Sequence, residues 1–295
     1  MIETTAVRKQ VPLMRVALYT GSCLVFLAGI QLFVLTTRTD HYFAWTIANP
    51  LTAAFLGAFY WTAIPLAFLS ARRRVWADAR VGVPGVLVFL WATLLTTLLH
   101  LGKFHFSSPD RFAKGAAWLW LIIYSADPVL VSVALVFQLR AGGADPARAA
   151  PLSTWYRSLL VAQSLVTPAV GVILFAAPGW AAGWWPWALT PLTARAMASW
   201  LLGLGVVLAT AFLENDWVRV RAATAAYAVL GILELVVLVR YGDHVSWASP
   251  GAWIYLGFVL SVLFAGGYGS WRLAMIGSRR DGLRGLDRLV RPEKN

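Results

Sequence analysis

The residues of this chain that could do chemistry are ionisable side chains inside long apolar runs. Asp127 lies near the centre of the fourth such run, and Glu234 lies within the seventh. An ionisable group in mid-membrane costs about 2.5 to 3.5 kcal/mol, so both acids should face protein or water. They could handle protons or cations, or they could lock helices together through a hydrogen bond or ion pair. Pro128 directly follows Asp127 and predicts a local break in that helix.

Two polar stripes occupy matching places in the third and seventh runs. At an offset of 141 residues, Thr93, His100 and Lys103 correspond to Glu234, Tyr241 and His244. Steps of seven and three residues keep each trio on one side of a helix, toward its outer end. If the two runs face each other, the stripes form an outward-open polar pocket for protons, cations or a small solute. If they do not, each trio snorkels at a helix end.

Histidines in the outer third offer a second kind of chemistry. His41, His100 and His244 are candidate ligands of a divalent metal, because imidazole with a nearby carboxylate suits zinc. Asp40 precedes His41, and Asp243 precedes His244. The alternatives are histidines that pack at the membrane interface and histidines that titrate.

Arg195 stands in the first turn of the sixth run, at the positive end of a helix dipole. This placement is unfavourable for a cation. It predicts either an acidic partner, for which Asp40 and Asp243 are available, or an anionic ligand.

Signatures of soluble-type catalysis are absent, among them HExxH, GxSxG, the P-loop and CxxC. The single cysteine, Cys23, lies inside the first apolar run, so no disulfide forms within one chain. The sequence therefore predicts no cofactor and argues against an enzyme.

These candidates must be positioned by membrane-spanning helices. The chain is 59% hydrophobic and 13% charged, whereas roughly 25% of a soluble domain is charged. Runs of about 20 apolar residues, enough to cross a bilayer, occur eight times. They lie at about 16–35, 49–71, 81–102, 115–139, 158–178, 192–213, 221–241 and 250–271. The first is too long for a signal-peptide core and lacks a cleavage site, so we interpret it as retained.

The eight runs divide into two similar sets of four. NPLTAA at 49–54 reappears as TPLTAR at 190–195, and matches continue upstream at an offset of 142. The sequence thus predicts an all-α membrane protein of two tandem parallel four-helix repeats, related by an axis along the membrane normal. The predicted divisions are a first repeat, a cytoplasmic linker, a second repeat and a basic cytoplasmic tail, at 1–140, 141–152, 153–275 and 276–295.

The second and sixth runs begin alike, with a capping residue followed by proline, at Asn49-Pro50 and Thr190-Pro191. Small residues follow at four-residue spacing, which permits close backbone approach and places both helices at the interface between the repeats. These small residues are Ala53, Gly57, Ala194 and Ala198.

Orientation follows from the basic residues. Of the 25 Lys and Arg, 19 fall on the side that holds both termini, which predicts cytoplasmic termini in a plasma membrane. The net charge of +12 then reflects topology and attraction to anionic lipid at the cytoplasmic face, and nucleic acid is not an expected partner. The tail from 278 to 295 is expected to lie on that face as a basic amphipathic helix.

HYFAWTI at 41–47, TPLTARA at 190–196 and ENDW at 214–217 give the chain a resemblance to a group of uncharacterised bacterial multi-pass membrane proteins, common in actinobacteria. That group has no established activity, so the resemblance implies a bacterial inner membrane and assigns no functional residue.

Three functions remain open at this stage. The first is a small carrier or channel-like protein with an outward-facing polar pocket. The second is a non-catalytic scaffold or partner subunit, as a homo-oligomer or with another membrane protein. The third is a membrane-embedded enzyme with an outer-face His and Asp site. A water-filled cavity that reaches Asp127 or Glu234 favours the first, whereas a dry, fully packed interior with both acids paired favours the second.

Overall fold

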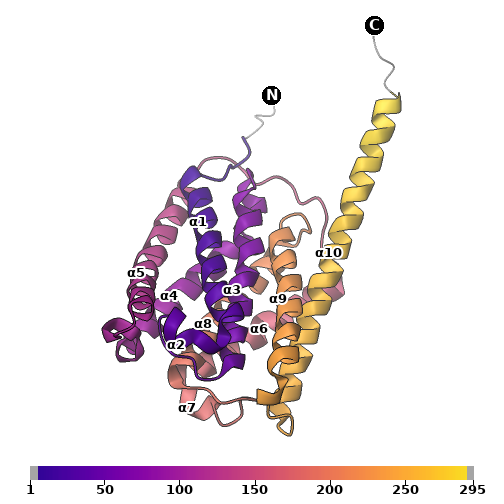
Figure 1. Cartoon of the computed structure of the whole chain (residues 1–295). Helices are drawn as coiled ribbons and strands as arrows, with labels where there is room; N and C mark the ends of the chain where they lie inside the picture. Colours follow the sequence, from indigo (N-terminus) through magenta and orange to yellow (C-terminus); the bar gives the residue numbers. More distant parts are fainter. Residues whose placement is uncertain (1–5, 291–295) are drawn as a thin grey trace.

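Every regular element is helical in the computed structural model, which describes residues 6–290 and the side chains of 6–278 (Figure 1). No strand occurs in that part of the chain. Its long helices are α1 (Pro12–Gly29), α3 (Pro50–Ala71), α4 (Val83–Leu99), α5 (Arg111–Arg140), α6 (Thr154–Ala176), α8 (Pro191–Glu214), α9 (Arg221–Tyr241) and α10 (Pro250–Val290). A π-helical turn, η1 (Ile30–Val34), extends α1, and short helical turns such as α2 (Thr39–Tyr42), α7 (Pro178–Ala181) and η7 (Gly242–His244) lie in the connections.

The eight predicted spans are confirmed. Eight helices are long and apolar enough to cross a membrane, and each overlaps one predicted run. Large apolar side chains on the outside of the bundle are exposed, including Val239 at 87% and Ile254 at 72%. Such surfaces suit contact with lipid tails and indicate a multi-pass membrane protein.

Local sequence explains where the helices begin. The Asn49 side chain accepts a hydrogen bond from the Leu51 N–H at 3.0 Å, directly before Pro50. Thr190 and Thr193 form a reciprocal capping box around the start of α8. These contacts satisfy amide groups that a helix leaves unpaired at its N-terminus. The two predicted caps are therefore confirmed.

The helices form an inner and an outer set. Inner α3, α4, α8 and α9 bury between 50% and 72% of their most apolar segments, and outer α1, α5, α6 and α10 bury between 22% and 33%. Helix α3 packs on α1 and α9, while α8 packs on α6 and α4. Exchanging the two halves of the chain leaves this pairing unchanged, as a duplicated unit requires. Superposition of the halves by one rotation stays a prediction.

The small residues of α3 and α8 were predicted to provide the close contact between the two halves, and the structure differs from that prediction. Helices α3 and α8 do lie between the halves, but Gly57 packs on η1 of its own half, where an added Cβ would lie 2.5 Å from the Phe33 nitrogen. The close contact between halves is Gly85 of α4 against Gly203 of α8. A Cβ on Gly85 would lie 2.4 Å from the Gly203 carbonyl oxygen, so these helices cross with their backbones almost touching.

The described chain begins and ends at the same end of the bundle, which we call the terminal end; the opposite one is the far end (Figure 1). Helix α10 continues unbroken to Val290 and projects beyond the bundle. The backbone of 278–290 therefore prolongs the last span, and the prediction of a separate surface helix is wrong for these residues. Residues 291–295 of the predicted tail lie outside the described part.

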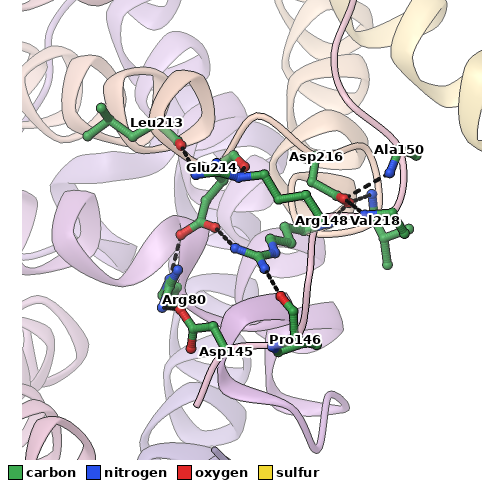
Figure 2. A network of polar contacts seen from close by, with 11 residues as sticks. Arg80, Asp145, Pro146, Arg148, Ala150, Leu213, Glu214, Asp216 and Val218 are labelled. Atoms are coloured by element: carbon green, nitrogen blue, oxygen red, sulfur yellow. Dashed lines mark hydrogen bonds and ion pairs between the residues drawn. The ribbon is translucent and has the colours of Figure 1, made fainter. Parts of the chain in front are cut away.

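A charged network ties the segment 141–152 to the terminal end (Figure 2). Glu214, at the end of α8, accepts hydrogen bonds from Arg80 Nε at 2.5 Å and from Arg219 at 3.0 Å. Arg80 also contacts Asp145 at 2.6 Å, and Arg219 donates to the Pro146 carbonyl. Buried charges are paired throughout, so the connection between the halves is fixed rather than loose.

Asp216, two residues after Glu214, anchors the same segment. Its carboxylate accepts the N–H groups of Ala149 and Ala150, at 2.5 and 3.0 Å (Figure 2). The residue is only 1% exposed. Because its charge is met by backbone donors, Asp216 needs no cation of its own.

Candidate functional site

A cavity of about 520 Å³ lies between α1, α3, α4 and α5 and continues inward to α8 and α9. Its volume falls in the range of about 300 to 1,000 Å³ that is typical of small-molecule sites. Along α1 the lining extends from Leu13 beyond Ala28. That is about 22 Å of helix, most of the hydrocarbon thickness of about 30 Å.

Part of the cavity wall is formed by exposed apolar side chains of α1 and α5. Its wall includes Val16 and Leu27 of α1 and Leu119 and Leu130 of α5, whose side chains are exposed. Gly21, midway along α1, also lines the cavity, and a Cβ added there would meet nothing within 4 Å. The exposed part of the wall is therefore apolar and suits contact with lipid tails.

Helices α1 and α5 are joined to each other at the terminal end of the bundle. At the terminal end the Gln138 side chain accepts the Val11 N–H at 2.8 Å and donates to the Lys9 carbonyl at 3.0 Å. Met14 of α1 and Ala134 of α5 share a small buried cluster just inside this contact. Beyond it, toward the far end, the two helices diverge around the cavity.

Asp127 is the one charged residue among the described residues of the cavity wall. It is half-buried, and no hydrogen bond or ion pair joins its side chain to any other residue whose side chain is described. It lies about 20 Å from the Arg140 end of α5 and about 24 Å from the Arg111 end, near mid-membrane. Helix α5 runs unbroken through Pro128, so the predicted break is wrong.

The polar atoms near Asp127 belong mainly to aromatic side chains. Tyr60 of α3 and Tyr124 of α5 share a hydrogen bond of 2.6 Å between their hydroxyl groups. Deeper in the cavity, the hydroxyl groups of Tyr227 and Thr62 are buried without a partner in the described part of the chain. Unpartnered hydroxyl groups in an apolar wall are available to a ligand.

Stacked rings form the inner wall. Phe89 of α4 stacks on Trp200 of α8 with ring centroids 3.7 Å apart, and Tyr60 meets Trp200 edge-on at 4.8 Å. Trp120 lies 4.3 Å from Tyr124 on α5. All of these rings line the cavity. Their faces carry partial negative charge, which an apolar wall of leucine would lack.

In the second half of the chain, a side-chain hydrogen bond bridges α6 and α10, the helices that the predicted repeat pairs with α1 and α5. Gln163 of α6, which the offset of 142 pairs with Gly21, donates a hydrogen bond to Ser261 of α10 at 3.0 Å. Aligning Trp118 with Trp253 pairs Ser261 with Ala126, which has no hydroxyl group. Glycine and alanine in the first half thus stand where a bridging glutamine and serine stand in the second.

Glu234, the other predicted acid, is enclosed. It is 1% exposed and accepts a hydrogen bond from the Tyr255 hydroxyl of α10 at 2.6 Å. It does not line the large cavity. Thr93 is also buried, on the α4 face that meets Trp120 and Trp200. The structural alternative therefore fits Glu234 better than ion handling.

The two predicted stripes are not brought together into one pocket. On α4, His100 Nε2 contacts an Arg195 guanidinium nitrogen at 2.9 Å, and Lys103 is exposed beyond it. On α9, Tyr241 hydrogen bonds to Thr36, and His244 is exposed. Each stripe thus packs on the opposite half of the chain, at a separate place on the far end.

Arg195 has no acidic partner among the described residues. Its Nε donates to the Phe175 carbonyl at 3.0 Å, and its second contact is the neutral acceptor His100. Asp40 and Asp243 are the acidic partners that the sequence suggested for Arg195. Both are exposed, and neither forms an ion pair with Arg195. Burial, then the charges of Arg195 and Lys103, lower the pKa of His100. The lowered pKa keeps the imidazole neutral and able to accept.

The candidate metal ligands His41, His100 and His244 are likewise apart. His41 bonds through Nδ1 to Asp110, the residue that caps α5, while His100 contacts Arg195. Within the described residues, no group of three or more His, Cys, Asp or Glu could hold a metal ion.

Sequence reasoning missed the residues that shape the site. Gly21 has no chemistry of its own, and Tyr60 and Trp200 resemble ordinary apolar helix positions. The signal that could have found Gly21 is the comparison between the halves, where a glycine faces a buried glutamine at the same place. Comparison with protein-family models, curated proteins and solved structures finds no match.

Proposed function

We propose that this chain is a membrane carrier or binding protein that takes a small lipophilic molecule from the bilayer into the cavity between α1 and α5. The observation that carries the proposal is the cavity itself. It has ligand-sized volume and an apolar and aromatic wall, part of which consists of exposed apolar side chains of α1 and α5. The cavity reaches Asp127, but its wall is apolar, so the ligand it suits is a lipophilic molecule and not the water-borne proton or cation that the sequence suggested.

An elongated ligand suits this shape best. The lining extends along most of α1 and turns inward to Tyr227 of α9, so a single alkyl chain can lie along α1 with its end among the rings. Each methylene moved from water into such a wall contributes about 0.8 kcal/mol. Transfer from lipid gains less, so polar and aromatic contacts must supply the preference for the cavity.

Filling the cavity at Gly21 tests the proposal. The Gly21→Phe side chain should enter open space on α1 and occupy volume that the ligand needs. We expect affinity for tritiated hexadecanol, measured by scintillation proximity with purified protein in maltoside micelles, to fall at least about tenfold. Such a fall corresponds to about 1.4 kcal/mol.

Gly257→Phe is the matched control. Gly257 is also a glycine of a spanning helix with nothing within 4 Å of an added Cβ, but it does not line the cavity. We expect its affinity to stay within about twofold of the wild type, because each factor of two is only about 0.4 kcal/mol. Equal binding by all three proteins, or no binding by the wild type, would overturn the proposed function.

A further inference from the structure

We propose that the ligand of this cavity is a lipophilic cation and that Asp127 is its counter-ion. The inference rests on the proposed function and adds the chemical class of the ligand. Three observations carry it: a carboxyl group without a partner, an aromatic wall beside that group, and no cationic residue in the described part of the wall.

Among the described side chains, no cation pairs with the carboxyl group of Asp127. Lys103 and Arg240 are the basic residues that could have paired with it from the far end. Arg240 instead donates to the Phe33 carbonyl at 2.6 Å and to Tyr241 at 3.0 Å, and Lys103 is exposed on the connection after α4. Because an isolated charge in mid-membrane is costly, a ligand that brings the opposite charge gains from entering.

The rings beside Asp127 favour a cation over a neutral molecule of the same shape. Tyr124 lies three residues before Asp127, on the same face of α5, and Trp120 lies one turn further. Tyr60 joins them through its hydrogen bond to Tyr124. Aromatic faces attract ammonium groups, and the attraction is strongest where water is excluded.

A neutral ligand is the competing case. Asp127 could carry a proton and exchange hydrogen bonds with a hydroxyl group, which requires no charge on the ligand. The two cases differ in one measurable quantity, which is the ratio of affinities for a cationic and a neutral ligand with the same alkyl chain.

The experiment measures the affinity of the wild-type protein, in maltoside micelles, for tritiated hexadecyltrimethylammonium and for tritiated hexadecanol. We expect the cation to bind at least about tenfold more tightly, because the aromatic faces and the carboxylate of Asp127 both attract it where water is excluded. Asp127→Asn should remove most of this preference and leave the affinity for hexadecanol within about twofold. Glu234→Gln, which alters an acid outside the cavity, should preserve the preference.

The outcomes separate the two proposals. The wild type could bind hexadecyltrimethylammonium and hexadecanol equally, with both affinities abolished by Gly21→Phe. That result would overturn the proposal of a cationic ligand and leave the proposed function standing. A fall in hexadecanol affinity in Asp127→Asn, with no change in the cation, would assign Asp127 to a hydroxyl group. If the wild type binds neither hexadecyltrimethylammonium nor hexadecanol, the proposed function itself is overturned. If Asp127→Asn fails to accumulate, the ratio measured on the wild type alone decides.

Discussion

Asp127 and Glu234 look alike in the sequence, because each is an acid within an apolar run. In the structure their surroundings differ. Glu234 is fully buried and outside the cavity; its Oε2 accepts from the Tyr255 hydroxyl group, and its Oε1 has no partner among the described residues. Asp127 lines a cavity and has no such partner among the described residues. Burial and partnership, which depend on neighbouring helices, decide which acid is available to a ligand.

His100 gives a prediction at the same scale. Its Nε2 must be unprotonated to accept from Arg195, and its pKa is lowered from 6.5 in the folded protein, first by burial and then by Arg195 and Lys103. The unfolded chain therefore binds the proton more readily. Stability from this contact is complete above about pH 6.5 and is lost as the pH falls through the lowered pKa.

We expect the thermal midpoint of the wild type to fall between pH 7.5 and pH 5 by more than that of His100→Asn, whose amide oxygen can accept from Arg195 without titrating. Intrinsic tryptophan fluorescence in detergent at a series of pH values measures both. Parallel curves for the two proteins would show that the His100 contact does not depend on protonation.

At the scale of elements, the sequence predicted where helices begin, but it did not predict how far apart they pack. Asn49-Pro50 and Thr190-Pro191 predict the beginnings of α3 and α8 because capping and proline act within a few residues. The gap between α1 and α5 depends on what fills it. Gln163 and Ser261 bridge α6 and α10, whereas Gly21 and Ala126 form no such bridge between α1 and α5, and only the assembled helices show this.

The charged network at the terminal end escaped prediction for a related reason. Arg80, Arg148 and Arg219 were counted as basic residues that set the orientation. The contacts of Arg80 and Arg148 with Glu214, and of Arg219 with Pro146, join residues more than 60 positions apart in the chain. Glu214 stands directly at the end of an apolar run, and Arg219 follows five residues later. This pair was the signal in the sequence from which a buried ion pair could have been predicted.

This network should contribute strongly to stability. Glu214→Gln removes the charge that holds Arg80 and Arg219, whose side chain is 7% exposed. Leaving a buried charge uncompensated costs about 3 to 5 kcal/mol. Unfolding in mixed micelles of dodecyl sulfate should report a loss of this size.

Asp145→Asn is the control for that prediction. Asp145 contacts Arg80 at 2.6 Å but is 31% exposed, so its loss should cost about 0 to 1 kcal/mol. Equal losses in the two variants would contradict a buried network centred on Glu214.

For the molecule as a whole, the sequence predicts an all-helical protein with eight spans because hydropathy and length act over whole segments. The same arguments placed the functional pocket at the ends of α4 and α9, where polar residues gather. The structure instead has its large cavity among apolar residues between α1 and α5. Hydropathy marks which segments enter the bilayer, but it carries no information about volume left empty between them.

The most direct test of the cavity is to locate a bound chain by photolabelling. Protein in phosphatidylcholine vesicles is irradiated with hexadecanol that carries a diazirine on its chain, and the adducts are mapped by peptide mass spectrometry. We predict adducts on the inner helix α8 at Trp200 and Leu204, which line the cavity, and their loss in Gly21→Phe. Adducts confined to lipid-facing residues such as Val239 and Ile254, in wild type and variant alike, would contradict the account.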